Sequence, residues 1–195
     1  MTIERSLSAD YFDNLYSADP DPWKFETSAY EAQKYEATIA ALNRDRYPSA
    51  LEIGCSIGVL TEKLAARCDK LLSLDVSSLA LEKAIDRCQN SPHVRFQVLN
   101  VPKQFPDETF DLIVVSEVGY YWCWEDLKLA QEKIYSSLTP KGQLLLVHWI
   151  HDAPDYPLRG NHVHDSFQEF AAGRLHQCTS QRTDNYRLDL YEKIE

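Results

Sequence analysis

The sequence predicts one α/β domain with a mostly parallel, seven-stranded sheet, one antiparallel strand, helices on both faces and an N-terminal helical lid. Three observations lead to this prediction. Between about residues 50 and 150, short apolar runs alternate with longer amphipathic segments, which is typical of βαβ units. A glycine-containing turn follows the first run, and the chain closes with two strand-like runs around a turn-prone segment.

Five apolar runs are predicted to form the parallel strands. Most of them are too apolar for a strand with one face in water, so we expect central strands that are covered on both sides. The runs are Ala50–Ile53, Lys70–Leu74, Val94–Leu99, Leu112–Ser116 and Gln143–Trp149.

The segments between these runs carry leucine and alanine at three- and four-residue spacing, which predicts helices with one buried stripe. They are Val59–Arg67, Leu79–Cys88 and Glu125–Leu138. Two prolines and a glycine in His151–Gly160 predict a loop, and a helical patch follows at Val163–Gly173. The runs Leu175–Ser180 and Tyr186–Glu192 are expected to close the sheet as an antiparallel hairpin.

The length and composition predict a single domain. With 195 residues, 44% of them hydrophobic, the chain has material for one sizeable core. We expect residues 1–48 to form a cap or lid and residues 49–195 to form the core. The cap is dense in aromatic side chains, which suggests a cover over a pocket, although the same rings could simply pack a helix onto the sheet.

The charge balance and the cysteines limit the partners and the compartment. Thirty acidic against 20 basic residues give a formal net charge of −10, which disfavours nucleic acid as a partner. No apolar stretch approaches the roughly 18 residues that span a bilayer, and the N-terminus lacks the pattern of a signal peptide, so we expect no membrane association. Five scattered cysteines predict free thiols in a cytoplasmic protein, which we expect to be a monomer or weak homodimer.

The strongest local motif is LEIGCSIG, residues 51–58, which ends the first strand and opens the first helix. Gly54 and Gly58 allow a tight turn that brings backbone N–H groups close to a ligand. A nicotinamide-binding turn would have glycines spaced GxGxxG, but Ser56 and Val59 occupy the second and third positions. The turn therefore disfavours a nicotinamide oxidoreductase.

Further motifs follow the next strands in the right order. Asp75 ends the second strand, 21 residues after Gly54, where this type of fold places a carboxylate that accepts bonds from ribose hydroxyls. Asn100 and Val101 follow the third strand, and Ser116, Glu117 and Val118 end the fourth. A Leu-Thr-Pro-Lys-Gly turn at residues 138–142 precedes the fifth strand.

Together these motifs resemble class I S-adenosylmethionine (SAM)-dependent methyltransferases, which have a Rossmann-like seven-stranded fold. The resemblance implies SAM as the cofactor and S-adenosylhomocysteine as its product. It places Glu52 near the methionine amino group, Asp75 at the ribose and Asn100 with Val101 at the adenine. Serine at residue 56 departs from the middle glycine of the motif, and Asn100 departs from the commoner Asp.

More narrowly, three segments resemble the nodulation protein S family, whose founding members N-methylate the free amine of a deacetylated chitooligosaccharide. They are FDNLYSADPDPWKFETSAYEAQKY, LEIGCSIGVLTEKLAARC and FDLIVVSEVGYY, within roughly residues 10–150. The segment 148–164 resembles broader bacterial relatives, so the substrate is expected only as a small molecule or oligosaccharide. The residues that the resemblance assigns to the cofactor are Trp23, Tyr30, Tyr35, Glu52, Gly54, Cys55, Ser56, Gly58, Asp75, Val76, Asn100, Val101, Ser116, Glu117 and Val118.

Methyl transfer is an in-line displacement, so positioning and the exclusion of water can supply most of the catalysis. An amine acceptor must be neutral to attack, and a nearby base helps. Glu117, His148 and His151 lie at or just past the C-terminal ends of predicted strands. We expect Glu117 near the cofactor and His148 or His151 as the proton acceptor, although both histidines could be ordinary strand-end residues.

Alternatives remain open from the sequence. The acceptor could be a hydroxyl of a sugar or metabolite, for which the base would be indispensable, or the chain could be a SAM-binding module without activity. Tyr120, Tyr121 and Trp122 could stack on a sugar or pack the start of the next helix. Four histidines and one aspartate could also form a metal site if the fold brought them together, namely His148, His151, Asp152, His162 and His164.

Overall fold

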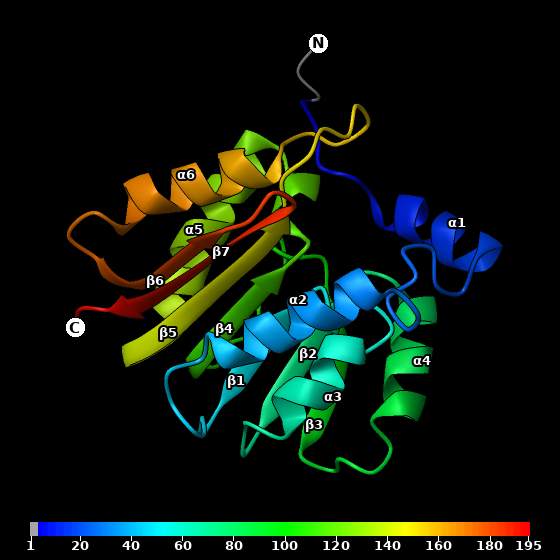
Figure 1. Cartoon of the computed structure of the whole chain (residues 1–195), viewed down its shortest axis with the longest axis horizontal. Helices are drawn as coiled ribbons and strands as arrows, with labels where there is room; N and C mark the ends of the chain where they lie inside the picture. Colours follow the sequence, from blue (N-terminus) through cyan, green and yellow to red (C-terminus); the bar gives the residue numbers. More distant parts are fainter. Residues whose placement is uncertain (1–3) are drawn as a thin grey trace. The chain divides into compact units, whose positions relative to one another are not determined.

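The computed structural model describes residues 4–195, so the first three residues of the predicted lid lie outside the described residues. The chain divides into two compact units. Figure 1 labels the helices and strands of both. The N-terminal unit is Ser8–Asn100, and the C-terminal unit is Val101–Glu195 together with the described residues 4–7. The organisation as one domain stays a prediction.

Four helices belong to the N-terminal unit: α1 (Ala9–Ala18), α2 (Ala29–Ala40), α3 (Val59–Ala65) and α4 (Ser78–Arg87). Serine side chains begin two of them, because the Ser28 and Ser77 hydroxyls accept the backbone N–H groups of Glu31 and Ala80. α1 packs on α4, and α2 packs on α3. The segment that the sequence predicts as a lid is therefore helical over about half of its described length.

The same unit holds three parallel strands, β1 (Ala50–Ile53), β2 (Leu71–Asp75) and β3 (Val94–Val98). Their order is β3-β2-β1. β1 is wholly buried and β2 nearly so, as their apolar sequences predict. β3 is half-exposed to exposed along its length, so the expectation of burial on both faces is wrong for this strand, which lies at an edge of the sheet.

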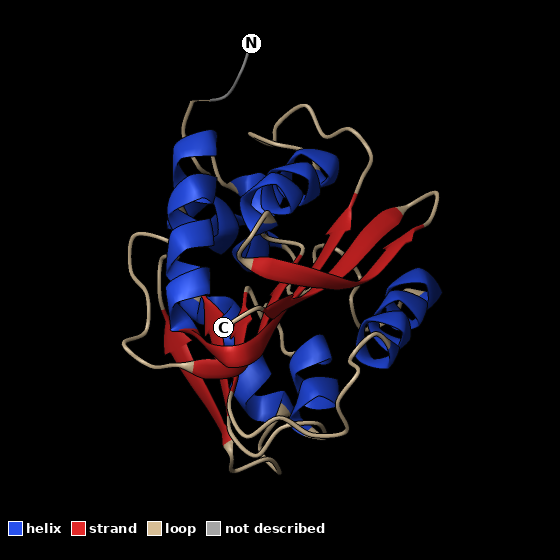
Figure 2. Ribbon diagram, turned by 90° about the vertical axis from the view of Figure 1, so that its left-hand side faces the viewer, coloured by secondary structure: helices blue, strands red, loops and turns tan. Residues whose placement is uncertain are grey.

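The C-terminal unit contains four strands and three helices. The strands are β4 (Phe110–Ser116), β5 (Leu138–Trp149), β6 (Leu175–Arg182) and β7 (Tyr186–Lys193). The helices are the 3₁₀ turn η1 (Gly119–Tyr121), α5 (Trp124–Ser137) and α6 (Gly160–Ala171). β4 and β5 are parallel, while β7 runs antiparallel to both β5 and β6, so the predicted closing hairpin is confirmed. Figure 2 shows the loops that separate these elements.

β5 begins five residues before the predicted strand. Its pairing with β4 starts at Leu138 opposite Phe110 and then shifts, so that Gln143 lies opposite Leu112. The predicted turn is thus an irregularity inside the strand, where Lys141 takes a positive φ of 63°. A Cβ on Gly142 would lie 2.8 Å from the Thr139 carbonyl oxygen, which explains why the position is glycine.

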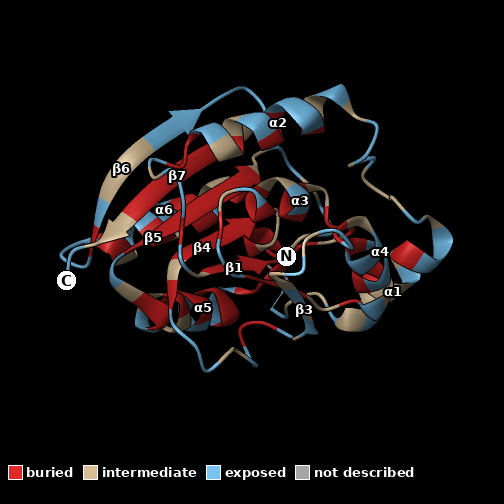
Figure 3. Cartoon of the chain, turned by 90° about the horizontal axis from the view of Figure 1, so that it is seen from below, coloured by how far each residue is buried: buried red, intermediate tan, exposed pale blue. Residues whose placement is uncertain are grey.

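The sheet has seven strands in the order β3-β2-β1-β4-β5-β7-β6. One strand, β7, is antiparallel to its neighbours, which confirms the predicted fold class. Figure 3 shows β4, β5 and β7 buried along most of their length, whereas β6 is half-exposed to exposed along most of its length. α6 packs against β5, β6 and β7, and α5 lies beside α6.

Candidate active site

The glycine turn between β1 and α3 has an unusual backbone. Gly54, Ser56 and Gly58 all have positive φ, of 80°, 50° and 82°. A Cβ on Gly58 would meet the Ala84 Cα at 2.9 Å, so α4 approaches this turn too closely for any other residue. Ser56 is the strained member, because a side chain in this conformation costs roughly 1–2 kcal/mol. The turn is held in place by other contacts.

Asp75 supplies one of those contacts. Its carboxylate oxygens accept the Ser56 N–H at 2.8 Å and the Ser77 N–H at 3.0 Å. The carboxylate therefore joins the turn after β1 to the turn after β2. Burial raises the pKa of Asp75 and outweighs the backbone bonds from Ser77 and Ser56, which lower it. Val76, the next predicted cofactor residue, is half-buried in the same turn.

Glu52 lies in the interior, 1% exposed. One carboxylate oxygen accepts the hydroxyls of Thr61 and Ser73, at 2.7 and 2.8 Å, so it fastens α3 and β2 to β1. Burial raises the pKa of Glu52 to about 7, although these two hydrogen bonds lower it. Its predicted contact with the cofactor stays a prediction.

Two residues of α1 reach the same turns, and the sequence reading did not single them out. The Tyr16 hydroxyl lies 2.5 Å from the Ser56 Oγ, and the Ser77 hydroxyl donates to Asp13 at 2.5 Å. Asp13 and Tyr16 are three residues apart on one helix, which places both on the same face. That spacing was a signal in the sequence, but only the fold shows what the face meets.

The predicted lid aromatics divide into two groups. Trp23 contacts the Tyr16 ring edge-on at 5.7 Å and stacks on Phe25, which in turn lies 6.4 Å from Tyr35. These rings form a continuous aromatic row within the N-terminal unit. Tyr30 instead has the buried Lys34 ammonium 5.0 Å from its ring centroid.

The predicted residues after β3 differ in exposure. Asn100, the last residue of the N-terminal unit, is exposed. Val101, the first residue of the C-terminal segment, is 8% exposed, and its carbonyl accepts the Trp122 indole N–H at 3.1 Å.

Cys55 is buried in the glycine turn, and burial holds the pKa of its thiol well above the ordinary value.

Glu117 follows β4 with a positive φ of 59°. Its backbone N–H bonds the Val147 carbonyl at 2.9 Å. One carboxylate oxygen accepts both the Tyr120 hydroxyl, at 2.6 Å, and the Trp149 backbone N–H, at 2.9 Å. The carboxylate is therefore fixed at the C-terminal ends of β4 and β5, between a buried Ser116 and a half-buried Val118.

The aromatic residues after Glu117 are covered. Tyr120, Tyr121 and Trp122 are only 4–8% exposed. Tyr156, from the loop after β5, stacks on Tyr120 at 5.2 Å and meets Tyr121 edge-on at 4.8 Å. The three residues thus pack within the C-terminal unit, and Tyr156 presents the half-exposed ring of this cluster.

The two predicted proton acceptors lie in different environments. His148 is fully buried, with one ring nitrogen 3.0 Å from the Gly119 N–H and the other 3.1 Å from His164. His148 is therefore a candidate for positioning, because neither nitrogen faces solvent. His151 is exposed, 2.9 Å from the Asn185 side-chain oxygen, and its ring lies 5.2 Å from Trp149. Its role as a base stays a prediction.

Among residues 4–195, no group of three or more His, Cys, Asp or Glu side chains is arranged to hold a metal ion. Of the histidines considered for such a site, His148 and His164 have ring nitrogens 3.1 Å apart. His148 and His164 are buried, whereas His151 and His162 are exposed.

Comparisons with known proteins point to the same family that the sequence motifs resemble. The family model of nodulation protein S matches residues 10–150. Nodulation protein S of Sinorhizobium fredii is 34% identical over 132 residues, which cover 66% of this chain and 60% of that one. The Bradyrhizobium diazoefficiens protein is 38% identical over 120 residues, 61% of this chain and 53% of that one. The chain thus spans less than two thirds of these curated relatives.

Solved structures share the fold. A Pseudomonas syringae structure assigned to the methyltransferases is 37% identical, with a TM-score of 0.74, over 85% of this chain and all of that one. The N-methyltransferase NodS from Bradyrhizobium japonicum, solved with S-adenosylhomocysteine, is 24% identical, with a TM-score of 0.85, over 97% of this chain and all of that one. The match to the family model covers well over half of the sequence. The chain therefore belongs to the nodulation protein S family.

Proposed function

We propose that the protein is a SAM-dependent methyltransferase that N-methylates an amine on a small molecule, amino sugar or glycan. The observation that carries the proposal is the glycine turn fastened to Asp75 through the Ser56 N–H, in a chain of the nodulation protein S family. The Bradyrhizobium japonicum relative is an N-methyltransferase, which supports the same chemistry.

The residues of the N-terminal unit fit this cofactor. The turn at Gly54–Gly58 has the backbone shape that admits a ligand close to the chain, and Asp75 supplies a carboxylate for ribose hydroxyls. The turn has no lysine of the kind that cradles phosphates, which fits SAM because SAM carries no phosphate groups. The aromatic row of Tyr16, Trp23 and Phe25 offers ring faces that suit a cationic group. When bound, SAM supplies an electrophilic methyl group.

The Glu117 carboxylate is proposed to serve the acceptor amine. An ammonium group must lose a proton before its nitrogen can attack, and a carboxylate both attracts the cation and accepts that proton. The bonds from Tyr120 and Trp149 hold the carboxylate in one orientation. Such preorganisation matters because displacement requires the nitrogen to line up with the methyl carbon.

Calorimetric titration with S-adenosylhomocysteine tests the cofactor. We expect binding by the wild type and much weaker binding by Asp75→Asn, because the amide cannot accept all the bonds that the carboxylate accepts. Asp86→Asn is the matched control, since it removes one negative charge from an exposed position of α4 in the same unit. Failure of the folded wild type to bind would overturn the proposal.

Transfer of a labelled methyl group from SAM to a panel of amines and alcohols then tests the acceptor. We expect labelled amines, and Glu117→Gln is expected to reduce kcat with little effect on the affinity for S-adenosylhomocysteine. Labelled alcohols in the absence of labelled amines would favour the second candidate, O-methylation. His151 supports that candidate, because it is an exposed imidazole just after β5, and His151→Gln should then abolish turnover.

A cytoplasmic location is part of the same proposal. All five cysteines are free, and four of them are buried as small core residues. Free thiols of this kind are typical of the reducing cytosol. No helix among residues 4–195 is long and apolar enough to cross a membrane.

A further inference from the structure

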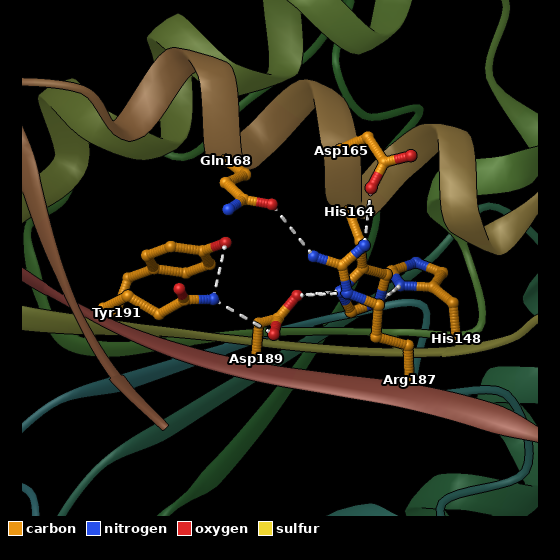
Figure 4. A network of polar contacts seen from close by, with 8 residues as sticks. His148, His164, Asp165, Gln168, Arg187, Asp189 and Tyr191 are labelled. Atoms are coloured by element: carbon orange, nitrogen blue, oxygen red, sulfur yellow. Dashed lines mark hydrogen bonds and ion pairs between the residues drawn. The ribbon is translucent and has the colours of Figure 1, made fainter. Parts of the chain in front are cut away.

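A buried chain of hydrogen bonds crosses the C-terminal unit from β7 to η1. Figure 4 shows the part of this chain from Asp189 to His148. It starts at Asp189 on β7, whose carboxylate lies 2.5 Å from the His164 Nδ1 on α6. The His164 Nε2 lies 3.1 Å from the His148 Nδ1 on β5, and the His148 Nε2 lies 3.0 Å from the Gly119 backbone nitrogen. All three side chains are 0% exposed, so water does not compete for these bonds.

The Gly119 end of the chain determines which atom donates in every hydrogen bond. The Gly119 backbone N–H can only donate, so the His148 Nε2 accepts and the proton of a neutral His148 sits on Nδ1. The His164 Nε2 must then accept, which puts the His164 proton on Nδ1, facing Asp189. Both imidazoles are thereby held neutral in one tautomer, with all the bonds aligned toward the Asp189 carboxylate.

The Asp189 end is anchored by further groups. Its carboxylate also forms an ion pair with the Arg187 Nε at 2.9 Å and accepts the Gln177 side-chain N–H at 3.2 Å. Burial raises the pKa of Asp189, but the hydrogen bonds from His164 and Ser180, together with the charge of Arg187, lower it by more, so the net shift is downward. The carboxylate is thus charged and can fix the His164 tautomer. Arg187 in turn pairs with the exposed Asp165 at 2.6 Å.

The Gly119 end touches the acceptor residues of the proposed function. Gly119 begins η1, and the next residue, Tyr120, donates its hydroxyl to Glu117. A Cβ on Gly119 would lie 2.6 Å from a Val163 methyl and 2.9 Å from the His148 Nε2, so η1 is pressed directly onto α6 and the histidine. Gly119 thus lies between the buried histidine and Tyr120, whose hydroxyl reaches the Glu117 carboxylate.

We propose that His148, His164 and Asp189 are positioning residues that hold η1 through the Gly119 N–H and so orient Tyr120 and Glu117. The effect on catalysis rests on the proposed function, whereas the hold on Gly119 does not. His148 acts through Gly119 and not by meeting the acceptor.

A pair of His148 variants separates this role from simple core packing. In His148→Gln the amide oxygen takes the place of Nε2 and can still accept the Gly119 N–H, whereas in His148→Asn the shorter side chain reaches only the Nδ1 position. A second pair tests the far end of the chain. Asp189→Asn removes the charge that fixes the His164 tautomer, and Asp165→Asn removes a charge from the same network without touching either histidine.

Three measurements are made on the full chain: hydrogen exchange of the segment 117–121, calorimetric affinity for S-adenosylhomocysteine, and kcat with KM. We expect faster exchange at Gly119 in His148→Asn and a fall in kcat of roughly 10- to 100-fold, with the affinity for S-adenosylhomocysteine unchanged. His148→Gln should recover most of that loss. Asp189→Asn should lower kcat by a smaller factor, and Asp165→Asn should leave it unchanged.

Equal losses in His148→Asn and His148→Gln, or unchanged exchange at Gly119 in folded His148→Asn, would overturn the proposal. If His148→Asn does not fold, ¹⁵N NMR of the wild-type imidazoles decides, because the proposal requires the Nδ1–H tautomer for both histidines and an Nε2–H tautomer of His148 contradicts it. A wild type that binds S-adenosylhomocysteine but methylates no acceptor refutes the proposed function alone. The exchange and NMR results then still decide the positioning role.

Discussion

Replacing Gly119 by alanine should disturb η1 through three close contacts with two residues. The added methyl group would lie 2.6 and 3.1 Å from the two methyls of Val163 and 2.9 Å from the His148 Nε2. Such overpacking in a buried region costs about 1–3 kcal/mol of the free energy of unfolding. Gly119→Ala should also weaken the bond to His148 and lower kcat with it.

Val163→Ala makes room for that methyl group, so the two substitutions form a double-mutant cycle. Val163 is fully buried, and removing its two methyls should by itself cost roughly 2 kcal/mol. In the double variant two of the three close contacts are relieved, while the one to His148 remains. We expect the loss in the double variant to be smaller than the sum of the single losses by roughly 1 kcal/mol.

Urea unfolding followed by circular dichroism measures the four free energies of unfolding in the cycle. Additivity within roughly 0.5 kcal/mol would show that Gly119 and Val163 do not meet, which would refute the packing of η1 on α6. This partial compensation in stability should come without any recovery of kcat, because the contact with His148 stays too short in the double variant.

Three further predictions concern single groups. Burial raises the pKa of Glu52 to about 7, so the contribution of Glu52 to the free energy of unfolding is complete below about pH 4.5 and is lost as the pH rises to 7. This loss is worth roughly 3 kcal/mol. Urea unfolding at pH 5 and 8 should show that Glu52→Gln removes it. Burial lowers the pKa of His164 despite the hydrogen bond to Asp189, so its contribution to stability is present above about pH 6.5 and lost as the pH falls below it; an NMR titration midpoint of His164 above 6.5 would contradict this. Tyr16→Phe should weaken the calorimetric affinity for S-adenosylhomocysteine several-fold by removing the hydroxyl bonded to Ser56, while unchanged affinity would count against α1 as a support of the turn.

Local patterns determined much of the fold. The apolar run Ala50–Ile53 and the hairpin at the end of the chain form where the sequence predicts them, because strand formation depends on side-chain alternation and turn residues that are close in the chain. The edge position of β3 was not predictable in this way, since its neighbours come from pairings that the chain order does not specify.

The candidate site likewise contains residues that local sequence patterns predict and residues that only the tertiary packing reveals. The glycine turn and Asp75 were evident from sequence, because a tight turn requires glycine and a strand end with a carboxylate is a local feature. Tyr16 was visible only as one aromatic residue among several. Its contact with Ser56 joins residues 40 positions apart, and that pairing is set by the packing of α1.

The histidines show most clearly what the sequence alone determined and what only the tertiary structure decided. The sequence placed His148 at the end of an apolar strand and thereby made it a candidate base. Only the fold brings His164 from α6 and Asp189 from β7 to its ring and buries all three. Burial and long-range hydrogen bonds decide which nitrogen carries a proton, and both arise from contacts between elements far apart in the chain.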